Sequence, residues 1–335
     1  MTGKKLKVEK TNILNKKTPQ SLIRSILPET RIFNIRKFDE GYNNDTYDVT
    51  LLEGHVVLKL ICNNTNNQRN ELATLGILRK TKSHRLFPKV IHFDLSSKNP
   101  YVLLEYLEGV PLSSVFEKVN NVEQIMEQLG QLKATLNSKK YSFFGKINAS
   151  NKEVGRYETL SEYFDADIQK IFQELCKDFK NEQLVSESRS FWTKNKTLFN
   201  QDEGPCLCHG DTSFQNILVK KSGSAWKITG LIDFEYAYSG GVASDLYSSP
   251  KSFLQVVPYL NSLEKGYNKV SSLPKNWKKI LWLSIWCRSV QWLKLLSSMS
   301  WQKLTASQEK ERKQKLKNKL LSIMAKAKFA VEGEK

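Results

Sequence analysis

The first third of the chain alternates apolar and polar residues, a pattern that predicts β-strands. Turn-forming Glu40-Gly41 and Glu53-Gly54 separate the first three runs, which indicates an antiparallel meander. Apolar residues at helical spacing predict one helix over residues 69–80 and a short helix over residues 19–27. The predicted strands span residues 33–38, 45–52, 56–61, 89–94 and 101–106. We therefore expect an antiparallel sheet with one inserted helix, ending near Glu108-Gly109.

The rest of the chain has mainly helical periodicity. One predicted strand pair interrupts it, with arms at residues 207–219 and 225–234 and a hairpin turn at Ser222-Gly223-Ser224. The predicted helical segments cover residues 114–136, 160–179, 185–199 and 277–330. The whole pattern indicates an α+β protein in which a small sheet-rich unit precedes a larger, mainly helical one.

Length and composition agree with a division into two units. A chain of 335 residues exceeds what a single core usually supports. We expect a basic, flexible N-terminus over residues 1–18, a first unit over residues 19–108 and a second over residues 109–335. The chain has no run of 18 apolar residues and no secretory signal, so we expect no membrane partner. Five cysteines are too few for a disulfide scaffold and predict a cytoplasmic location.

The net charge of +18 suggests polyanions or a nucleotide as partners, but most of it lies at the two ends. Residues 1–30 hold seven basic and two acidic residues, and residues 301–335 hold ten and four. These 65 residues thus carry +11, and the remaining 270 only +7. Counterion release rewards clustered bases, so this distribution predicts solvated ends, and we do not expect nucleic acid as a partner.

Three oxygen-bearing side chains flank the predicted hairpin. Asp211 and Asn216 lie at the start of its first arm, and Asp233 lies at the end of the second. Antiparallel pairing around Gly223 would bring them to the same end of the sheet. Two carboxylates and an amide suit Mg²⁺, which prefers oxygen ligands. If Asn216 and Asp233 bind the metal, Asp211 is left to accept a proton. The alternative is that these residues only cap turns and helices.

A second candidate group lies in the sheet-rich unit. Lys59 shares a strand face with Val57 and Ile61, so its ammonium group would need a partner. Glu71, in the next helix, is a candidate counter-ion. The turn Gly41–Thr46 could let backbone amides approach phosphate. The alternative is an ordinary hairpin beside a surface Lys–Glu pair.

These segments resemble the aminoglycoside phosphotransferase and choline kinase superfamily. His209-Gly210-Asp211, with Asn216 following, resembles its H-G-D-x-x-x-x-N signature, and Ile232-Asp233-Phe234-Glu235 resembles I-D-[FW]-E. Further segments that resemble the family are its phosphate loop at Gly41–Val49, lysine strand at Val57-Leu58-Lys59, hinge at Tyr101–Gly109 and downstream segment at Ser244-Asp245-Leu246. The resemblance covers about residues 30–250 and leaves both basic ends outside.

The resemblance implies a bilobal protein-kinase-like fold, in which a nucleotide-binding lobe over residues 19–108 precedes a catalytic and substrate-binding lobe over residues 109–335. ATP or GTP would bind between the lobes, with Mg²⁺ on Asn216 and Asp233. Asp211 would accept the proton of a substrate hydroxyl. The residues implied to bind the nucleotide are Gly41, Asn44, Lys59, Glu71, Glu105, Tyr106 and Leu107. His209 would orient the catalytic loop rather than act as a base.

Substrate-binding candidates are less sharply defined. Late helices help to shape the acceptor pocket in this family, which makes Trp282, Trp286 and Arg288 candidates, together with Glu235. The aromatic stripe also fits a helical core. Cys206 and Cys208 fit buried thiols better than a zinc site, because no second ligand pair follows. Carboxylates that could bind a polycationic acceptor are Glu158, Glu162, Asp165, Asp167, Asp202, Glu203 and Glu235.

The sequence therefore predicts a Mg²⁺-dependent small-molecule O-phosphotransferase, with an antibiotic-inactivating, aminoglycoside-phosphotransferase-like enzyme as the favoured subtype. A choline- or sugar-type metabolite kinase is the alternative within enzymes. An alternative of another class is a catalytically idle kinase-like protein with a binding or structural role. The idle protein would be expected to lack catalytic residues, whereas Lys59, Asp211, Asn216 and Asp233 are all present.

Overall fold

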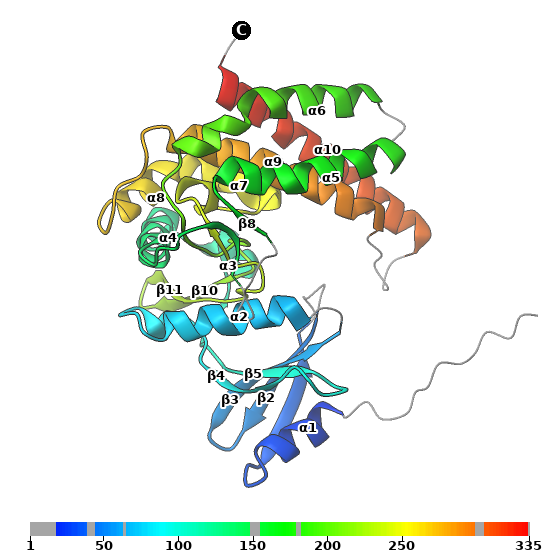
Figure 1. Cartoon of the computed structure of the whole chain (residues 1–335). Helices are drawn as coiled ribbons and strands as arrows, with labels where there is room; N and C mark the ends of the chain where they lie inside the picture. Colours follow the sequence, from blue (N-terminus) through cyan, green and yellow to red (C-terminus); the bar gives the residue numbers. More distant parts are fainter. Residues whose placement is uncertain are drawn as a thin grey trace, which may run out of the picture. The chain divides into compact units, whose positions relative to one another are not determined.

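The computed structural model describes residues 18–38, 44–62, 65–147, 155–178, 182–298 and 305–333. The chain forms two compact units (Figure 1). The N-terminal unit comprises residues 1–68 and 89–106, and the C-terminal unit comprises residues 69–88 and 107–335. Residues 69–88, which the sequence places in the first lobe, thus group with the C-terminal unit.

The N-terminal unit is built on a five-stranded antiparallel sheet in the order β1-β2-β3-β5-β4, as the alternating pattern predicts. One helix, α1 (Pro19–Ile26), precedes it, capped by the Thr18 side chain. The strands are β1 (Ile32–Lys37), β2 (Asn44–Leu51), β3 (Gly54–Ile61), β4 (Val90–Asp94) and β5 (Tyr101–Glu105).

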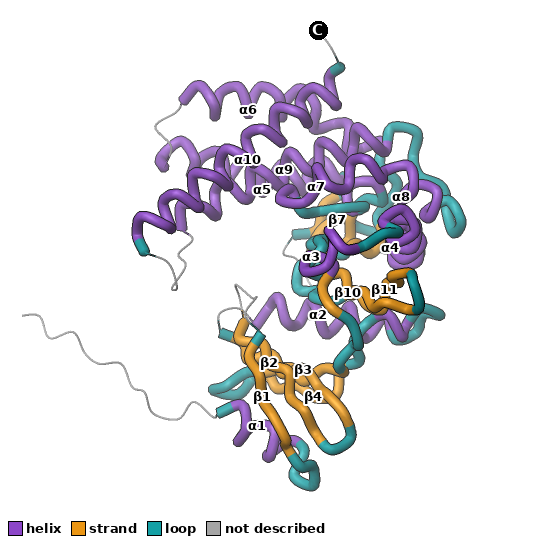
Figure 2. The backbone as a smooth tube through the Cα atoms, turned by 180° about the vertical axis from the view of Figure 1, so that it is seen from behind, coloured by secondary structure: helices purple, strands orange, loops and turns teal. Residues whose placement is uncertain are grey.

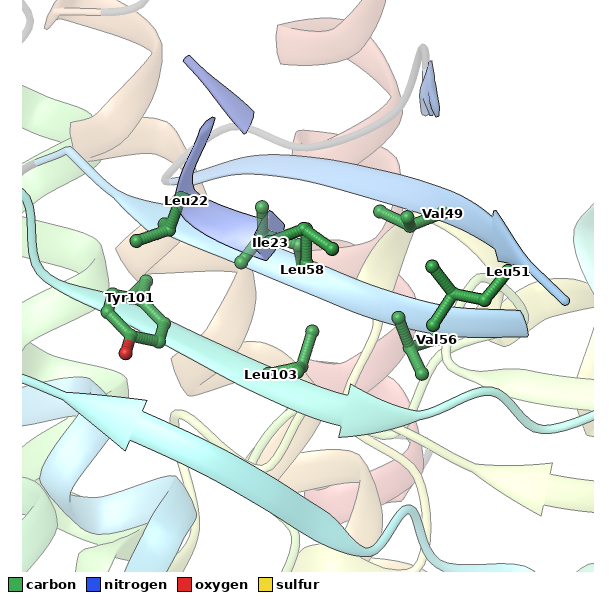
Figure 3. Close-up of a cluster of buried hydrophobic side chains, with 8 residues drawn as sticks. All are labelled: Leu22, Ile23, Val49, Leu51, Val56, Leu58, Tyr101 and Leu103. Carbon is green, nitrogen blue, oxygen red and sulfur yellow. The ribbon is translucent and has the colours of Figure 1, made fainter. Parts of the chain in front are cut away.

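A compact apolar cluster joins α1 to this sheet (Figure 3). Leu22 and Ile23 of α1 pack against inward-facing residues of the central strands, among which Leu58 and Leu103 are completely buried. The remaining members are Val49, Leu51, Val56 and Tyr101. Burial of these side chains fixes the strand register, because a slip by one residue would turn each of them to the opposite face.

The C-terminal unit is mainly helical. The α-helix α2 (Thr65–Leu78) begins in the N-terminal unit, and its residues from Arg69 onward belong to the C-terminal unit. The other α-helices are α3 (Leu112–Val115), α4 (Val122–Asn137), α5 (Leu160–Asp178), α6 (Glu182–Asn195), α7 (Pro250–Val256), α8 (Leu260–Tyr267), α9 (Trp277–Ser298) and α10 (Ala306–Glu332). Short 3₁₀ helices are η1 (His84–Leu86), η2 (Phe116–Lys118), η3 (Lys196–Gln201), η4 (Ala243–Asp245) and η5 (Val257–Tyr259).

Helix packing in this unit brings distant segments together. Helices α5, α9 and α10 lie side by side (Figures 1 and 2), and α7 packs against both α9 and α10. Helices α4 and α8 approach closely because Gly130 and Gly266 each place a bare backbone against the partner helix. No helix in the described part of the chain is long and apolar enough to span a membrane.

Two sheets lie in the C-terminal unit, where the sequence predicts a single strand pair. One has the order β11-β10-β6 and contains the predicted hairpin, and the other has the order β8-β7-β12-β9. The hairpin strands are β10 (Ile217–Ser222) and β11 (Ala225–Leu231), joined to β6 (Val110–Pro111). The second sheet consists of β7 (Phe144–Lys146), β8 (Arg156–Tyr157), β9 (Cys206–Cys208) and β12 (Tyr238–Gly240).

The predicted continuous arm over residues 207–219 is therefore wrong. It consists of β9 and β10, separated by a loop over residues 209–216, and β9 pairs with β12 rather than β11. Gly210 causes part of this break, because its φ of 80° departs from strand geometry and an added Cβ would collide with the Tyr236 carbonyl. The break is what creates a loop for the candidate catalytic residues.

Two predicted helical segments are likewise divided. Residues 114–136 contain the end of α3, η2 and most of α4, and the polar pair Asn120-Asn121 precedes α4. Residues 277–330 contain α9 and most of α10 rather than one stretch. Helix α10 has its own start signal, a capping box formed by Thr305 and Gln308.

Candidate active site

The loop over residues 209–216 positions Asp211 beside Asn216. The Asn216 side-chain amide donates to the Asp211 backbone carbonyl at 2.9 Å and to its Oδ2 at 3.0 Å. Both bonds use the amide nitrogen, so the Asn216 Oδ1 is kept for another partner. The carboxylate of Asp211 is thus held in one orientation by a residue of its own loop.

The hairpin register brings Asp233 to the same end of the sheet, as the sequence predicts. Ile217 pairs with Leu231, and the Ile232 amide donates to the Asn216 carbonyl at 3.0 Å. Asp233 itself has a φ of 67°, which non-glycine residues rarely adopt and which costs on the order of 1–2 kcal/mol. Its neighbours hold this backbone conformation, because the Phe234 amide donates to Glu71 Oε1 at 3.3 Å.

Asp211 is electrostatically unusual. Burial is the largest effect on its pKa, and together with the charge of Asp233 it raises the pKa of Asp211 to about 6. The positive charges of Arg288 and Lys251 and the hydrogen bond from Asn216 oppose this rise. A carboxyl group with such a pKa is a stronger proton acceptor than an ordinary surface aspartate, which suits a general base.

A buried ion pair holds the start of the catalytic loop. Asp245 of η4 accepts the amides of His209 at 2.7 Å and Gly210 at 2.9 Å, and it pairs with Lys133 of α4. Lys133 also donates to Thr212 Oγ1 at 3.0 Å. Burial alone would raise the pKa of Asp245, yet the charge of Lys133 and these hydrogen bonds hold it below its ordinary value. The pair therefore fixes residues on both sides of Asp211.

Lys133 is absent from the sequence-based candidates, although its position on an apolar helix face indicates a buried charge that needs a partner. It lies four residues after Leu129 and seven after Met126, on the buried face of α4. A lysine on such a face needs a charged partner, because a buried, unpaired ammonium is costly. The partner itself, Asp245, is distant in the sequence.

His209 is a structural rather than a basic member of the site. Its ring is fully buried, Nε2 donates to the Ile232 carbonyl at 3.0 Å, and Nδ1 accepts the Asp211 amide at 3.2 Å. Burial, and secondarily the charge of Lys133, lowers the pKa of His209 to about 4. The neutral imidazole joins the catalytic loop to the end of the hairpin, as expected of a residue that orients the loop.

This depressed pKa predicts a pH dependence of stability. Between about pH 4 and pH 6.5 the unfolded chain binds a proton at His209 that the folded chain does not, so stability contributed by this site falls as the pH drops. We expect the unfolding free energy of the wild type, relative to His209→Gln, to decrease by about 3 kcal/mol from pH 7 to pH 4. Urea unfolding of both proteins across this range measures the difference. A pH-independent difference would contradict the assignment of a buried neutral imidazole.

Three carboxylates of the C-terminal unit could hold a metal ion. One oxygen each of Glu71, Asp233 and Glu235 lies within 4.8 Å of the others, and both glutamates are buried. The Asn70 amide fixes this region by donating to the Glu235 carbonyl at 3.1 Å and the Ala237 carbonyl at 2.5 Å. An all-oxygen donor set fits a hard divalent cation such as Mg²⁺. Glu71 is thus placed next to Asp233, a position that the sequence does not predict for it.

The nucleotide-binding candidates lie in both units. Lys59 of β3 is buried, with only 8% of its surface exposed, so it is not the surface lysine of the alternative interpretation. Its register partners are Thr46 of β2 and Val102 of β5. Asn44 begins β2, whereas Gly41 lies outside the described residues.

The predicted hinge residues follow β5. The Glu105 amide donates to the Lys89 carbonyl at 2.8 Å, and the Tyr106 ring lies 5.1 Å from that of His55. Leu107 belongs to the C-terminal unit, where it packs over Gly230. Nucleotide binding by the hinge stays a prediction.

The candidate substrate residues of α9 differ in their surroundings: some pack in the helical core, and one acts on the active site. Trp286 is completely buried and stacks on Trp192 at 6.2 Å, which favours the core interpretation for this residue. Trp282 packs edge-on against Phe253 at 4.7 Å. Arg288 differs from both, because its positive charge acts on Asp211.

Several acidic candidates for a polycationic acceptor have structural partners. Asp165 accepts from Trp192 and pairs with Lys196 at 2.9 Å. Asp202 accepts the amides of Ala243 and Ser244, and Glu162 accepts the amide of Thr159. Cys206 and Cys208 are buried thiols that donate to the carbonyls of Gly240 and Gly241, as the buried-thiol interpretation predicts.

Comparison with known proteins gives two consistent results. Residues 34–268 match the model of the phosphotransferase enzyme family. The fold is similar to that of aminoglycoside phosphotransferase APH(4)-Ia, with a TM-score of 0.60, 14% identity and coverage of 91% of this chain and 97% of that one. A comparison with curated sequences finds no match.

Two further solved structures are similar. A putative fructosamine-3-kinase from Haemophilus somnus 129PT has a TM-score of 0.59 and 15% identity, with 89% of this chain and 96% of that chain covered. The ADP-bound aminoglycoside phosphotransferase APH(2″)-Ib has a TM-score of 0.57 and 17% identity, with 91% and 97% covered. At these identities the likeness shows the kinase-like fold.

Proposed function

The chain belongs to the phosphotransferase enzyme family, and we propose that it transfers the γ-phosphoryl group of ATP or GTP to a hydroxyl group of a small molecule. The observation that carries this proposal is the placement of Asp211 beside Asn216 at the same sheet end as Asp233. Phosphoryl transfer needs positioning and charge neutralisation more than covalent catalysis, and these three residues could position the acceptor hydroxyl and hold a cation that neutralises phosphate charge.

Asp211 is proposed as the proton acceptor. The acceptor oxygen forms a bond to the γ-phosphorus as the bond from that phosphorus to the β,γ-bridging oxygen breaks, and the nucleoside diphosphate leaves. The hydroxyl proton passes to Asp211 Oδ, whose raised pKa favours its uptake. Asn216 holds the carboxylate in position for this step through its amide nitrogen.

The phosphates require cationic partners. We propose that Asp233 and Asn216 Oδ1 hold Mg²⁺, which when bound neutralises phosphate charge, and that Glu71 and Glu235 stand next to this site. Lys59 is proposed for the α- and β-phosphates, and the backbone of residues 105–107 for the base. An APH(4)-Ia variant of the same fold was solved with AMP-PNP and hygromycin B, which supports a nucleotide donor.

The antibiotic-inactivating subtype is supported by the names of the similar structures, and the metabolite-kinase alternative by the putative fructosamine-3-kinase among them. Asp165 is paired with Lys196, and Glu162 and Asp202 already accept backbone amides, so fewer of these carboxylate oxygens are available to an aminoglycoside. The acceptor is therefore proposed as a small-molecule hydroxyl, with an antibiotic and a metabolite as the two outcomes of the transfer assay. The predicted compartment stays the cytoplasm, and the cysteines whose side chains are described are free thiols.

A radiolabelled transfer assay tests the proposed function. We expect the purified chain with Mg²⁺ and γ-labelled ATP or GTP to label one class among aminoglycosides, macrolides, choline and sugars, or their charged derivatives. EDTA should abolish the reaction. Release of nucleoside diphosphate without any acceptor would still report the phosphotransferase site. Intact nucleotide under all conditions, with no nucleotide-induced rise in melting temperature, would favour the idle kinase-like protein instead.

A further inference from the structure

Arg288 of α9 has donor capacity that its protein surroundings do not use. Its Nη1 donates to Gln291 Oε1 at a long 3.4 Å, and its buried Nε donates to no acceptor in the described part of the chain. Gln291 in turn donates to Asp167 at 2.7 Å, and Arg288 forms no ion pair with a carboxylate in the part of the chain that the structure describes. The side chain as a whole is partly buried, and a buried guanidinium nitrogen normally donates a charge-assisted hydrogen bond, so Nε is suited to a bound acceptor.

The position of Arg288 relates it to the catalytic loop. Its guanidinium lies 5.9 Å from the centre of the Tyr238 ring, and Tyr238 of β12 pairs in register with Cys208 of β9. Cys208 precedes Asp211 by three residues. The positive charge of Arg288 accordingly acts on the Asp211 carboxylate. The Arg288 Nε therefore lies in the part of the active site around Asp211, where the substrate hydroxyl must bind.

Lys251 of α7 adds a second positive charge from another direction. The Ser248 amide donates to the Thr212 carbonyl at 3.0 Å, which ties the segment before α7 to the catalytic loop. Lys251 follows three residues later, and its ammonium lies 3.6 Å from the centre of the Trp292 ring of α9. Its charge also acts on Asp211. Two cations on different helices thus act electrostatically on one catalytic carboxylate.

The basic C-terminal helix strengthens this positive field. Helix α10 packs against α7 and α9, and Arg312 and Lys319 of α10 act on Lys251. Burial is the largest effect, and with these two charges it lowers the pKa of Lys251 to about 8 although Asp211 opposes the change. Asp167 is the nearby acidic group on α5, and Gln291 bonds it. Asp211 and Asp245 also act on Arg288, and the basic side chains of α7, α9 and α10 would disfavour a polycationic acceptor beside them.

We propose that Arg288 and Lys251 form an anion-binding subsite beside Asp211, so that the acceptor carries a carboxylate or phosphate group close to the hydroxyl that is phosphorylated. This inference rests on the proposed phosphotransferase function and names the substrate class for it. A guanidinium can hold either oxyanion through two parallel hydrogen bonds, and the ammonium can add a point charge. The subsite would exclude choline and aminoglycosides by like-charge repulsion.

Matched acceptors provide the test. Two series of acceptors are used, each with a neutral parent, its carboxylate and its phosphate ester. The first consists of glycerol, glycerate and glycerol 3-phosphate, and the second of glucose, gluconate and glucose 6-phosphate. Choline and kanamycin are the cationic acceptors for comparison. Each is added to the full chain with Mg²⁺ and AMP-PNP, and melting temperature is measured. Labelled transfer from ATP or GTP is measured in parallel. Glycerate and gluconate report a carboxylate, whereas the two phosphates report a phosphate ester. The variants are Arg288→Met and Lys251→Met, with exposed Lys278→Met of α9 as the matched control.

We expect at least one anionic member of a series to stabilise the wild type and to be phosphorylated faster than its neutral parent. Arg288→Met and Lys251→Met should each raise KM for that anion by about tenfold or more, while the KM for nucleotide changes little. Lys278→Met should behave like the wild type. Melting curves without ligand identify any variant that fails to fold, and the Arg288→Lys variant then serves in place of Arg288→Met.

Several results would overturn the subsite. These are stabilisation or transfer only with neutral or cationic acceptors, no effect of any anion on the wild type, or equal anion effects in the wild type and both variants. A change in nucleotide KM alone would assign Arg288 to the phosphoryl donor and also overturn it. Intact nucleotide under all conditions in the wild type, with no nucleotide-induced rise in melting temperature, would instead reject the proposed function, so the two failures are distinguishable.

Discussion

Replacing Lys133 with methionine should destabilise the protein by about 3–5 kcal/mol, because it leaves Asp245 buried without its cation. The two side chains are completely enclosed, and Asp245 is hydrogen-bonded to the amides of His209 and Gly210. Methionine preserves most of the volume of lysine, so the loss reports charge rather than packing. Denaturant unfolding measures the free energy, and the transfer assay measures turnover of the folded fraction.

The exposed pair Lys315–Glu311 on α10 provides the matched control. Lys315→Met removes the same charge from a solvated i,i+4 pair and should change stability by no more than about 0.5 kcal/mol. If Lys133→Met lowers the free energy of unfolding by no more than Lys315→Met does, the Lys133–Asp245 pair does not support the catalytic loop. A strongly destabilised Lys133→Met that keeps wild-type kcat would show that the pair stabilises the fold without positioning Asp211.

The central part of this site could be predicted from the sequence because it is local. Asp211, Asn216 and Asp233 lie within one loop and one hairpin, and antiparallel pairing leaves little choice about where the ends of such a hairpin meet. The turn at Gly223 and the alternation of β10 and β11 determine the register. The prediction needed no knowledge of distant contacts: the Asn216–Asp211 hydrogen bonds and the pairing of Ile217 with Leu231 bring the three residues to one end of the hairpin, while their catalytic roles stay predictions.

The supporting residues could not be predicted in the same way. Lys133 and Asp245 are 112 residues apart, and no local pattern specifies which helix will pack against η4. For the same reason, the pairing of β9 with β12 is missed, since each strand has only three residues and no hairpin joins them. Short strands with distant partners acquire their structure from tertiary packing rather than from their own propensity.

The charge distribution was only partly informative for a related reason. Counting residues assigns much of the positive charge to the C-terminal end and leaves it outside the family resemblance. In the folded C-terminal unit, α10 packs against α7 and α9, and Arg312 and Lys319 act on Lys251. A sum along the chain cannot show which basic residues face a functional group, because that depends on helix packing.

Replacing Asp211 with asparagine should reduce kcat by about a thousandfold, the order of magnitude expected when a general base is lost. Asparagine has nearly the same shape and can still accept the Asn216 amide, but it cannot take a proton from the acceptor hydroxyl. The variant should still fold, because asparagine is neutral and avoids the free-energy cost of burying a carboxylate charge. That cost is the main reason why the pKa of Asp211 is raised to about 6. The KM for nucleotide should change little, since Asp211 is not assigned to the phosphates.

Asp233→Asn separates this role from metal binding. We expect it to weaken Mg²⁺-dependent nucleotide binding by about tenfold or more, because a neutral amide is a poorer ligand for a hard cation than a carboxylate. Exposed Glu123→Gln on α4 controls for the loss of one negative charge and should leave both parameters unchanged. Initial rates across nucleotide and Mg²⁺ concentrations distinguish the cases. Wild-type kcat in Asp211→Asn would refute the proton-acceptor role, and an effect on nucleotide affinity alone would move Asp211 to the donor side of the reaction.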